Sequence, residues 1–264
     1  MRRILRKFRP RFVKHLFRTL LLQMFLEWIG VKGWDSLKLQ VSLMISVINQ
    51  LWIQKVLLLF MEQVTSLNLE IVRALAREGI PSIGMSPFSC GWSTCQRNMT
   101  EADISMVIKA IDAGFIPVLH GDAVLDTLQE CTILSGDVII RHLAAELKPE
   151  FVVFLTDVLG VYDRPPVEPG AVLIREIAVR EDGSWSVVKP ILEDTSKPVE
   201  FTVAAHDTTG GMVTKITEAA MIAKLGIDVY ITKAGTDHSV KALSGFLKGG
   251  IPDDWLGTAI RYMS

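Results

Sequence analysis

Cysteine is scarce in this chain of 264 residues, and neither sign of charge is in excess. The three cysteines, Cys90, Cys95 and Cys131, are too few and odd in number for a disulfide framework, so we expect a reducing, cytoplasmic location. Cys90 and Cys95 have no histidine near them, and we therefore expect no metal held by protein side chains alone. The formal net charge of −1 lacks the basic excess of nucleic-acid-binding proteins, so nucleic acid is not an expected partner.

A long apolar run is also missing. The segment 16–29 is interrupted by Arg18, Gln23 and Glu27, whereas a membrane span needs about 20 apolar residues. The first 24 residues carry eight Arg or Lys, but they contain no serine, which transit peptides use heavily. We therefore expect no membrane association, and a targeting peptide is not favoured either.

From Thr65 onward, segments typical of helices alternate with short apolar segments typical of strands. The unbroken apolar run 151–156 is typical of a buried strand in a parallel sheet. We predict an α/β fold with a mainly parallel sheet covered by helices on both faces. The expected helices are 67–77, 100–113, 137–147, 213–225 and 238–247; the expected strands are 80–85, 115–120, 151–156 and 227–232, with a hairpin over 124–134.

The run His206–Lys215 is the strongest local signal in the sequence. Its Gly210-Gly211 pair lets the backbone approach a ligand closely because no Cβ intervenes. Lys215 follows at the expected start of a helix, where free N–H groups already favour an anion. The run therefore indicates a phosphate site, with a solvated helix lysine as the plainer alternative for Lys215.

Acidic turns follow other predicted elements. Ser135-Gly136-Asp137 opens a helix, and Asp157 follows the strand 151–156. His120-Gly121-Asp122 follows the strand 115–120. Ligands of open α/β sheets bind at the carboxyl ends of strands, so these turns are candidates for a site. For His120 and Asp122, a structural role is the favoured interpretation, and a role in a site is the alternative.

Three motifs together resemble the isopentenyl phosphate kinases of the amino-acid kinase superfamily, in their plant-type branch. These motifs are Thr132–Asp137, Thr156–Tyr162 and Asp207–Lys215, and the resemblance extends from about residue 64 to residue 263. The resemblance implies an open αβα sandwich that forms a homodimer. It also implies an enzyme that transfers the γ-phosphate of ATP to isopentenyl phosphate, a step of isoprenoid synthesis, with Mg²⁺ bridging the ATP phosphates.

The resemblance implies roles for single residues as well. Asp137 and Lys215 would form the catalytic pair, with Asp137 holding the lysine, and Gly136 would lie beside the phosphate of isopentenyl phosphate. The ATP-binding residues would be Thr156, Asp157, Gly210, Gly211 and Lys215.

Residues 1–64 depart from the family pattern. The family's Lys-Leu-Gly-Gly strand and its His-Gly-Gly/Ala-Gly-Ser-Phe-Gly-His loop are not found in this segment. Codons that encode residues 60–64 can read His-Gly-Ala-Gly in a shifted frame, although codon degeneracy permits many such readings. Our hypothesis divides the chain into an atypical segment 1–64, translated out of frame, and an amino-acid kinase domain 65–264 that lacks its first strand and loop.

Two other functions stay open at this point. Without the N-terminal loops, the chain could be a catalytically inactive kinase-like fragment or a dimer partner for an intact subunit. A second alternative keeps the kinase chemistry and changes the acceptor to another small phosphate or carboxylate.

Overall fold

The computed structural model describes residues 57, 59–96, 98–190 and 211–263. Its internal contacts divide the chain into the units 1–58 and 59–264, and the second unit holds every labelled element below. In the part that the structure describes, no helix combines the length and apolar character needed to cross a membrane.

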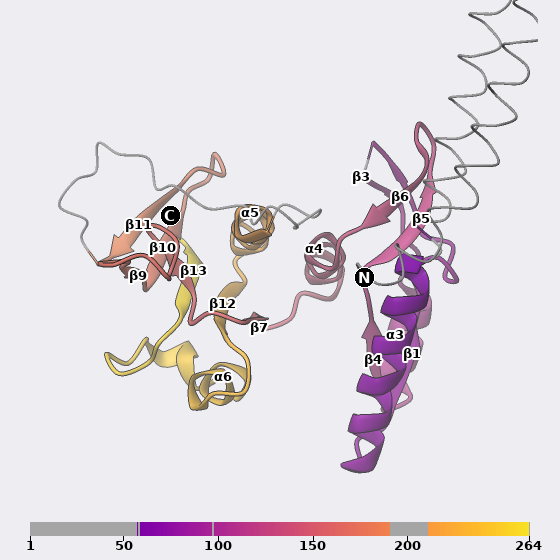
Figure 1. Ribbon diagram of the computed structural model, residues 1–264, viewed down its shortest axis with the longest axis horizontal. Coiled ribbons are helices and arrows are strands. Elements are labelled where there is room, and N and C mark those ends of the chain that lie inside the picture. The colour runs from indigo at the N-terminus through magenta and orange to yellow at the C-terminus, as the bar shows by residue number, and fades with distance from the viewer. Residues whose placement is uncertain (1–56, 58, 97, 191–210, 264) are drawn as a thin grey trace, which may run out of the picture. The chain divides into compact units, whose positions relative to one another are not determined.

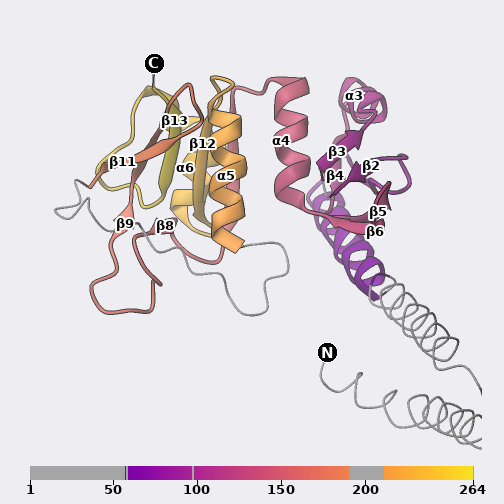
Figure 2. The same ribbon diagram turned by 90° about the horizontal axis from the view of Figure 1, so that it is seen from above.

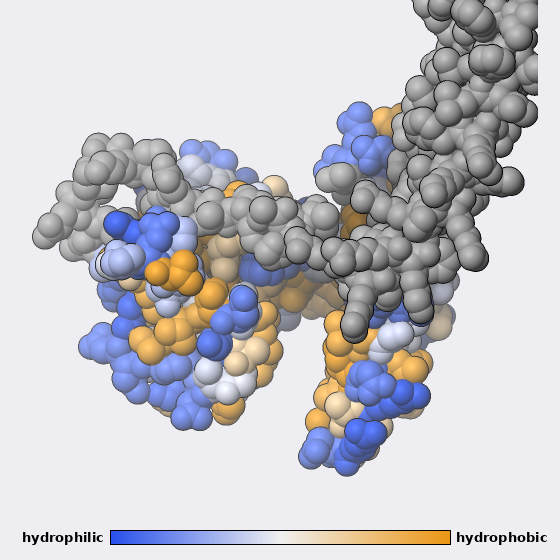
Figure 3. All heavy atoms as spheres, viewed as in Figure 1, coloured by the Kyte–Doolittle hydropathy of each residue, from blue (hydrophilic) through white to orange (hydrophobic). Residues whose placement is uncertain are grey.

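The first elements of the second unit are a helix and a two-stranded parallel sheet. Residues 59–77 are helical, so the predicted helix 67–77 is confirmed and begins earlier. Strand β1 (Ser82–Met85) pairs with β4 (Ile116–Leu119), and helix α3 (Ser105–Asp112) precedes β4. The strand predicted over 80–85 is present as β1, and Met85 is its one buried residue. Apolar side chains remain exposed over these elements (Figure 3).

The predicted start of the helix 100–113 is wrong. Residues Asn98–Glu101 form strand β3, which pairs with β2 (Ser93–Cys95), and α3 begins only at Ser105. Pairing with β2 draws residues 98–101 into a strand, and the Asp103 carboxylate, which accepts hydrogen bonds from the N–H and the hydroxyl of Ser105, closes the turn before α3. These hydrogen bonds also lower the pKa of Asp103, the backbone bond first.

The predicted hairpin is confirmed as β5 (Asp122–Asp126) and β6 (Glu130–Leu134). With β2 and β3 these strands form a four-stranded sheet in the order β3-β2-β5-β6. The Asp126 carboxylate holds the hairpin turn by accepting from the N–H groups of Leu128 and Gln129. Trp92 is buried in the core of this part of the chain.

A five-stranded sheet follows, in the order β11-β10-β13-β12-β7. Its pairing is mixed, because β7 with β12 and β10 with β13 are parallel whereas β12 with β13 and β10 with β11 are antiparallel. The antiparallel pairs arise from β13, which sequence reasoning missed, and from the β10–β11 hairpin. The strands are β7 (Phe151–Thr156), β10 (Glu176–Val179), β11 (Trp185–Lys189), β12 (Asp228–Lys233) and β13 (Thr258–Tyr262), beside the small pair β8 (Val161–Tyr162) and β9 (Leu173–Ile174).

Helices cover both faces of this sheet, as predicted. Helix α5 (Gly211–Ala223) and helix α6 (Asp237–Leu243) lie on opposite sides of β12 in Figure 1. The predicted helix 238–247 is split, because α6 ends early and a 3₁₀ turn, η1 (Phe246–Gly249), follows. The core residues alternate accordingly along the strands: Val152, Phe154, Val229 and Ile231 pack in the α5 layer, and Phe151, Val153 and Tyr230 pack in the α6 layer. The αβα sandwich is therefore confirmed.

Candidate functional site

Helix α4 (Gly136–Leu147) begins with the predicted Ser135-Gly136-Asp137 turn. Ser135 caps the helix, because its Oγ accepts from the Asp137 N–H at 3.2 Å. Gly121 lies against this turn, since a Cβ on Gly121 would stand 3.3 Å from the Gly136 nitrogen. The two predicted motifs are therefore neighbours at the N-terminus of α4, where unpaired N–H groups favour an anion.

Asp137 and Lys215 are brought together from α4 and α5. The Lys215 Nζ donates to Asp137 Oδ1 at 2.7 Å, and the two side chains are only 20% and 18% exposed. The same ammonium lies 4.9 Å from the ring centroid of Phe154, on strand β7. Low exposure strengthens this ion pair relative to a surface pair, because water screens it less.

A second ion pair joins the same two helices one turn further on, and sequence reasoning missed it. The Arg141 Nε donates to Glu218 Oε2, and Glu218 is 8% exposed. Burial raises the pKa of Glu218, Arg141 opposes this shift, and the Asp137 carboxylate adds to it. The sequence did carry a signal for this pair. Arg141 follows Asp137 by four residues and Glu218 follows Lys215 by three, so each lies on the same helix face as its predecessor. Figure 2 shows α4 and α5 side by side.

The carboxyl end of β7 carries Thr156 and Asp157. The Thr156 hydroxyl donates to the Val158 carbonyl at 2.7 Å and so turns the chain, while Asp157 is exposed. Gly160 completes the turn beneath β13, where a Cβ would lie 2.6 Å from the Thr258 Oγ1. Thr156 is paired in register with Lys233 at the end of β12, a residue that the sequence analysis did not single out.

Gly211 begins α5 with a φ of +56°, which favours glycine over other residues. Helix α5 leads through a short turn into β12, so it runs antiparallel to that strand. Its 13 residues and the six of β12 each span about 20 Å. The N-terminus of α5 therefore lies at the carboxyl edge of β7 and β12. Gly210 and His206, the other candidates of this run, lie outside the described residues.

Asp122 has a structural role. It is 1% exposed, and its Oδ2 accepts from the Ser86 hydroxyl at 2.6 Å and from the Phe88 N–H at 3.1 Å. Its Oδ1 accepts from the Ala123 N–H at 2.9 Å. Oδ2 thus holds the turn that follows β1, and Oδ1 is used within β5 itself. The His120 ring, half-buried, lies with Nδ1 3.0 Å from the Gly121 carbonyl.

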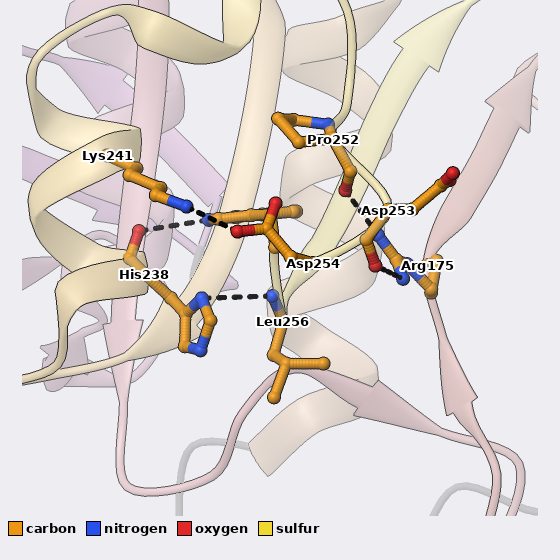
Figure 4. A network of polar contacts seen from close by, with 8 residues as sticks. Arg175, His238, Lys241, Pro252, Asp253, Asp254 and Leu256 are labelled. Atoms are coloured by element: carbon orange, nitrogen blue, oxygen red, sulfur yellow. Dashed lines mark hydrogen bonds and ion pairs between the residues drawn. The ribbon is translucent and has the colours of Figure 1, made fainter.

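The first turn of α6 is fixed by the segment 252–256 (Figure 4). The Leu256 N–H donates to His238 Nδ1 at 3.1 Å, and the Trp255 indole N–H donates to the His238 carbonyl at 3.0 Å. Thr236 is the capping residue of α6, in a reciprocal box with Ser239, and Asp237 is the first residue of the helix. Trp255 is fully buried and packs in the core beside α6.

No group of three or more His, Cys, Asp or Glu side chains within the described ranges has the geometry to hold a metal ion. The three cysteines are free thiols. Burial raises the pKa of Cys90 and of Cys131, which disfavours their reactive thiolate forms.

Comparisons with known proteins agree with this fold and these motifs. The model of the amino acid kinase family matches residues 26–233. The chain is 73% identical to isopentenyl phosphate kinase of Arabidopsis thaliana over 201 residues. This matched stretch covers 75% of this chain and 60% of that protein. The chain is 34% identical over 186 residues to isopentenyl phosphate kinase of Methanothermobacter thermautotrophicus, 69% of this chain and 64% of that protein.

A solved structure of isopentenyl phosphate kinase matches with a TM-score of 0.58 and 29% identity, over 77% of this chain and 69% of that chain. A substrate complex of the same enzyme matches with a TM-score of 0.53 and 25% identity, over 75% of this chain and 67% of that chain. The chain belongs to the amino acid kinase family. It spans about three fifths of the length of the two sequence relatives, 60% of one and 64% of the other.

Proposed function

We propose that the chain is an ATP-dependent kinase that phosphorylates isopentenyl phosphate to isopentenyl diphosphate in isoprenoid biosynthesis. The observation that carries this proposal is the Asp137–Lys215 pair, held at 2.7 Å between two helices at the carboxyl edge of the sheet. The likeness to two proteins named isopentenyl phosphate kinase, at 73% and 34% identity, supports the choice of acceptor.

Lys215 would neutralise charge on the transferred phosphoryl group, because phosphoryl transfer depends on fixed positive charge and N–H donors around the reacting oxygens. Asp137 would hold the ammonium in place through its hydrogen bond. The backbone of Gly210 and Gly211 would approach the ATP phosphates at the start of α5. Thr156 and Asp157 would line the nucleotide site at the end of β7.

The phosphate of isopentenyl phosphate would lie at the N-terminus of α4, beside Gly136. The free N–H groups of this helix start favour an anion, and a Cβ on Gly136 would meet no atom within 4 Å, so the space beside Gly136 is open. This arrangement sets acceptor and donor phosphates on either side of the Asp137–Lys215 contact.

Mg²⁺ would bridge the ATP phosphates and offset their charge in the transition state. The residues present fit this role, since Mg²⁺ is usually held by substrate phosphates with one or two carboxylates and does not need a dedicated protein cage. Asp157, exposed at the end of β7, would supply such a carboxylate.

We further propose a homodimer in the cytoplasm. The free thiols are compatible with a reducing compartment. Light scattering coupled to size-exclusion chromatography of the purified full chain tests the dimer, and a monomer at micromolar concentration would contradict it.

The primary test measures isopentenyl diphosphate formed from ATP and isopentenyl phosphate by the purified full chain and by Lys215→Ala. Lys224→Ala is a matched control, because Lys224 is an exposed lysine just beyond the other end of α5. We expect turnover by the wild type and by Lys224→Ala, and a loss of about 10²–10³-fold in Lys215→Ala. A folded wild type without turnover would contradict the proposal.

We also propose that residues 1–64 include out-of-frame sequence. The family model begins to match at residue 26, inside this segment, so the whole of it needs to be tested. Sequencing of the transcript across the codons of residues 1–64 provides the test. An uninterrupted and supported frame as printed would contradict this hypothesis.

A further inference from the structure

Lys233 lies on the same face of the sheet as the candidate site. Along β12, Val229 and Ile231 pack in the α5 layer and Tyr230 packs in the α6 layer. Because side chains alternate along a strand, Lys233 at the end of β12 belongs to the α5 face. The same alternation places Thr156 on this face, two residues after Phe154.

Thr156 and Lys233 are register partners in the parallel pair of β7 and β12. Neighbouring strands are about 4.8 Å apart, so the two side chains leave the sheet next to each other. The N-terminus of α5, with Gly211 and Lys215, lies over this same edge, and Phe154 is the residue that the Lys215 ammonium contacts. Lys233 is therefore placed at the same edge and on the same face of the sheet as the candidate nucleotide site.

The charge balance of the site favours a second cation. Asp137 offsets the charge of Lys215 through their ion pair, so the two together contribute little net charge. Lys233 is exposed, and none of the ion pairs found among the described residues involves it. A polyphosphate arriving at the α5 N-terminus would meet this ammonium without having to displace a carboxylate.

We propose that Lys233 binds the phosphate chain of the nucleoside triphosphate, as a second cation beside Lys215. This inference rests on the proposed function for the identity of the ligand. Lys233 would act on binding of the polyphosphate, whereas Lys215 would act on the transferred group. Binding of the base and the ribose of the nucleotide would not depend on Lys233.

Calorimetric titration of the full chain with ATP, ADP and adenosine tests this inference without relying on turnover. We compare the wild type with Lys233→Ala, Lys233→Arg and the control Lys224→Ala. Because a hydrogen bond to a charged group is worth more than a neutral one, Lys233→Ala should weaken ATP and ADP binding about tenfold or more. Adenosine affinity should be unchanged, and Lys233→Arg should restore most of the loss.

Equal ATP affinity in the wild type and Lys233→Ala would overturn the inference. An equal loss for adenosine and ATP would also overturn it, because the lysine would then act on the fold or on the base. A wild type that binds no nucleotide would overturn both this inference and the proposed function. If ATP binding depends on Lys233 but isopentenyl phosphate is not phosphorylated, the inference stands and only the proposed function fails.

Discussion

Lys215 holds its charge at a place where water has limited access. Its ammonium donates to Asp137 at 2.7 Å and lies 4.9 Å from the Phe154 ring centroid. The carboxylate fixes the position of the ammonium, and the ring contributes a cation–π attraction without a competing hydrogen bond. A lysine held in this way needs little reorganisation before it meets a phosphate.

Asp137→Asn should reduce turnover while leaving the fold intact. The amide keeps the size of the side chain but loses the charge-assisted hydrogen bond that positions Lys215. We expect kcat to fall by about tenfold or more, with a smaller effect than that of Lys215→Ala, because the lysine remains present. Steady-state kinetics with ATP and isopentenyl phosphate provide the measurement. Unchanged kcat in a folded variant would argue against a positioning role of Asp137.

At the scale of elements, helices α4 and α5 are joined by two ion pairs on successive turns, Asp137–Lys215 and Arg141–Glu218, and Glu218 is the most buried of the four side chains. Such pairs add little net stability in general, because burial costs each charge its hydration. The effect of Glu218 on the pH dependence of the free energy of unfolding is more informative. Burial raises the pKa of Glu218 above its ordinary value of 4.5, although Arg141 acts in the opposite direction.

Glu218→Gln should remove one component of the pH dependence of stability. A carboxyl with a pKa raised by folding holds its proton more tightly in the folded state. Its contribution to the free energy of unfolding is therefore full below pH 4.5 and is lost as the pH rises through the folded-state pKa. Urea unfolding between about pH 4 and pH 7 should show the wild type losing stability relative to the variant as the pH rises.

Glu146→Gln controls for the removal of one carboxylate from the same helix pair, since Glu146 is exposed on α4. A constant difference between wild type and Glu218→Gln at every pH would contradict the raised pKa of Glu218.

The turn after β7 depends on a close approach between Gly160 and β13. The Thr258 hydroxyl accepts from the Val161 N–H and donates to the Ile174 carbonyl, which ties this turn to two other strands. A Cβ on Gly160 would lie 2.6 Å from the Thr258 Oγ1 and 3.0 Å from its backbone nitrogen. Glycine in the Thr156–Tyr162 motif therefore serves packing as well as turn formation.

Gly160→Ala should destabilise the protein by about 1–3 kcal/mol, because neither the β13 backbone nor the bonded hydroxyl can move away freely. Gly249→Ala is the control, since a Cβ there meets no atom within 4 Å. Thermal unfolding of both variants provides the measurement. Equal unfolding temperatures for the two variants would mean that the turn adapts without cost.

At the scale of the whole molecule, the apolar side chains of the described residues are buried to different degrees in different elements. The core between the five-stranded sheet and its helices is closed, whereas β1 and β4 keep Ile83 and Ile116 more than 40% exposed. Strand β7 pairs only with β12 among the described residues, and its Leu155 is 48% exposed. The candidate site is therefore built on the part of the chain with the closed core, at the five-stranded sheet and the contact of α4 with α5.

Nucleotide binding should stabilise the folded chain by mass action. At an ATP concentration of about 100 times Kd, the stabilisation is about 2.7 kcal/mol, which corresponds to several degrees in Tm. Differential scanning fluorimetry with ATP and Mg²⁺ provides the measurement, with Lys215→Ala expected to show a smaller shift. No shift in the wild type would contradict nucleotide binding by the chain.

The sequence by itself determined the elements whose signals are local. The hairpin 122–134, the start of α4 at Ser135 and the end of α5 before Gly226 follow from alternation, capping and glycine, which act within a few residues. The motifs around Asp137 and Lys215 could be found for the same reason. The false helix start at Thr100 shows the limit, because pairing with β2 outweighed the local helical preference.

Only the tertiary structure decided which distant residues meet. Asp137 and Lys215 are 78 positions apart, and Arg141 and Glu218 are 77 apart, so their contacts depend on how α4 packs against α5. The burial of Asp122 under the Ser86 turn and the register of Thr156 with Lys233 depend likewise on strand placement. Packing of apolar faces sets these positions, and it acts between segments that no local pattern connects.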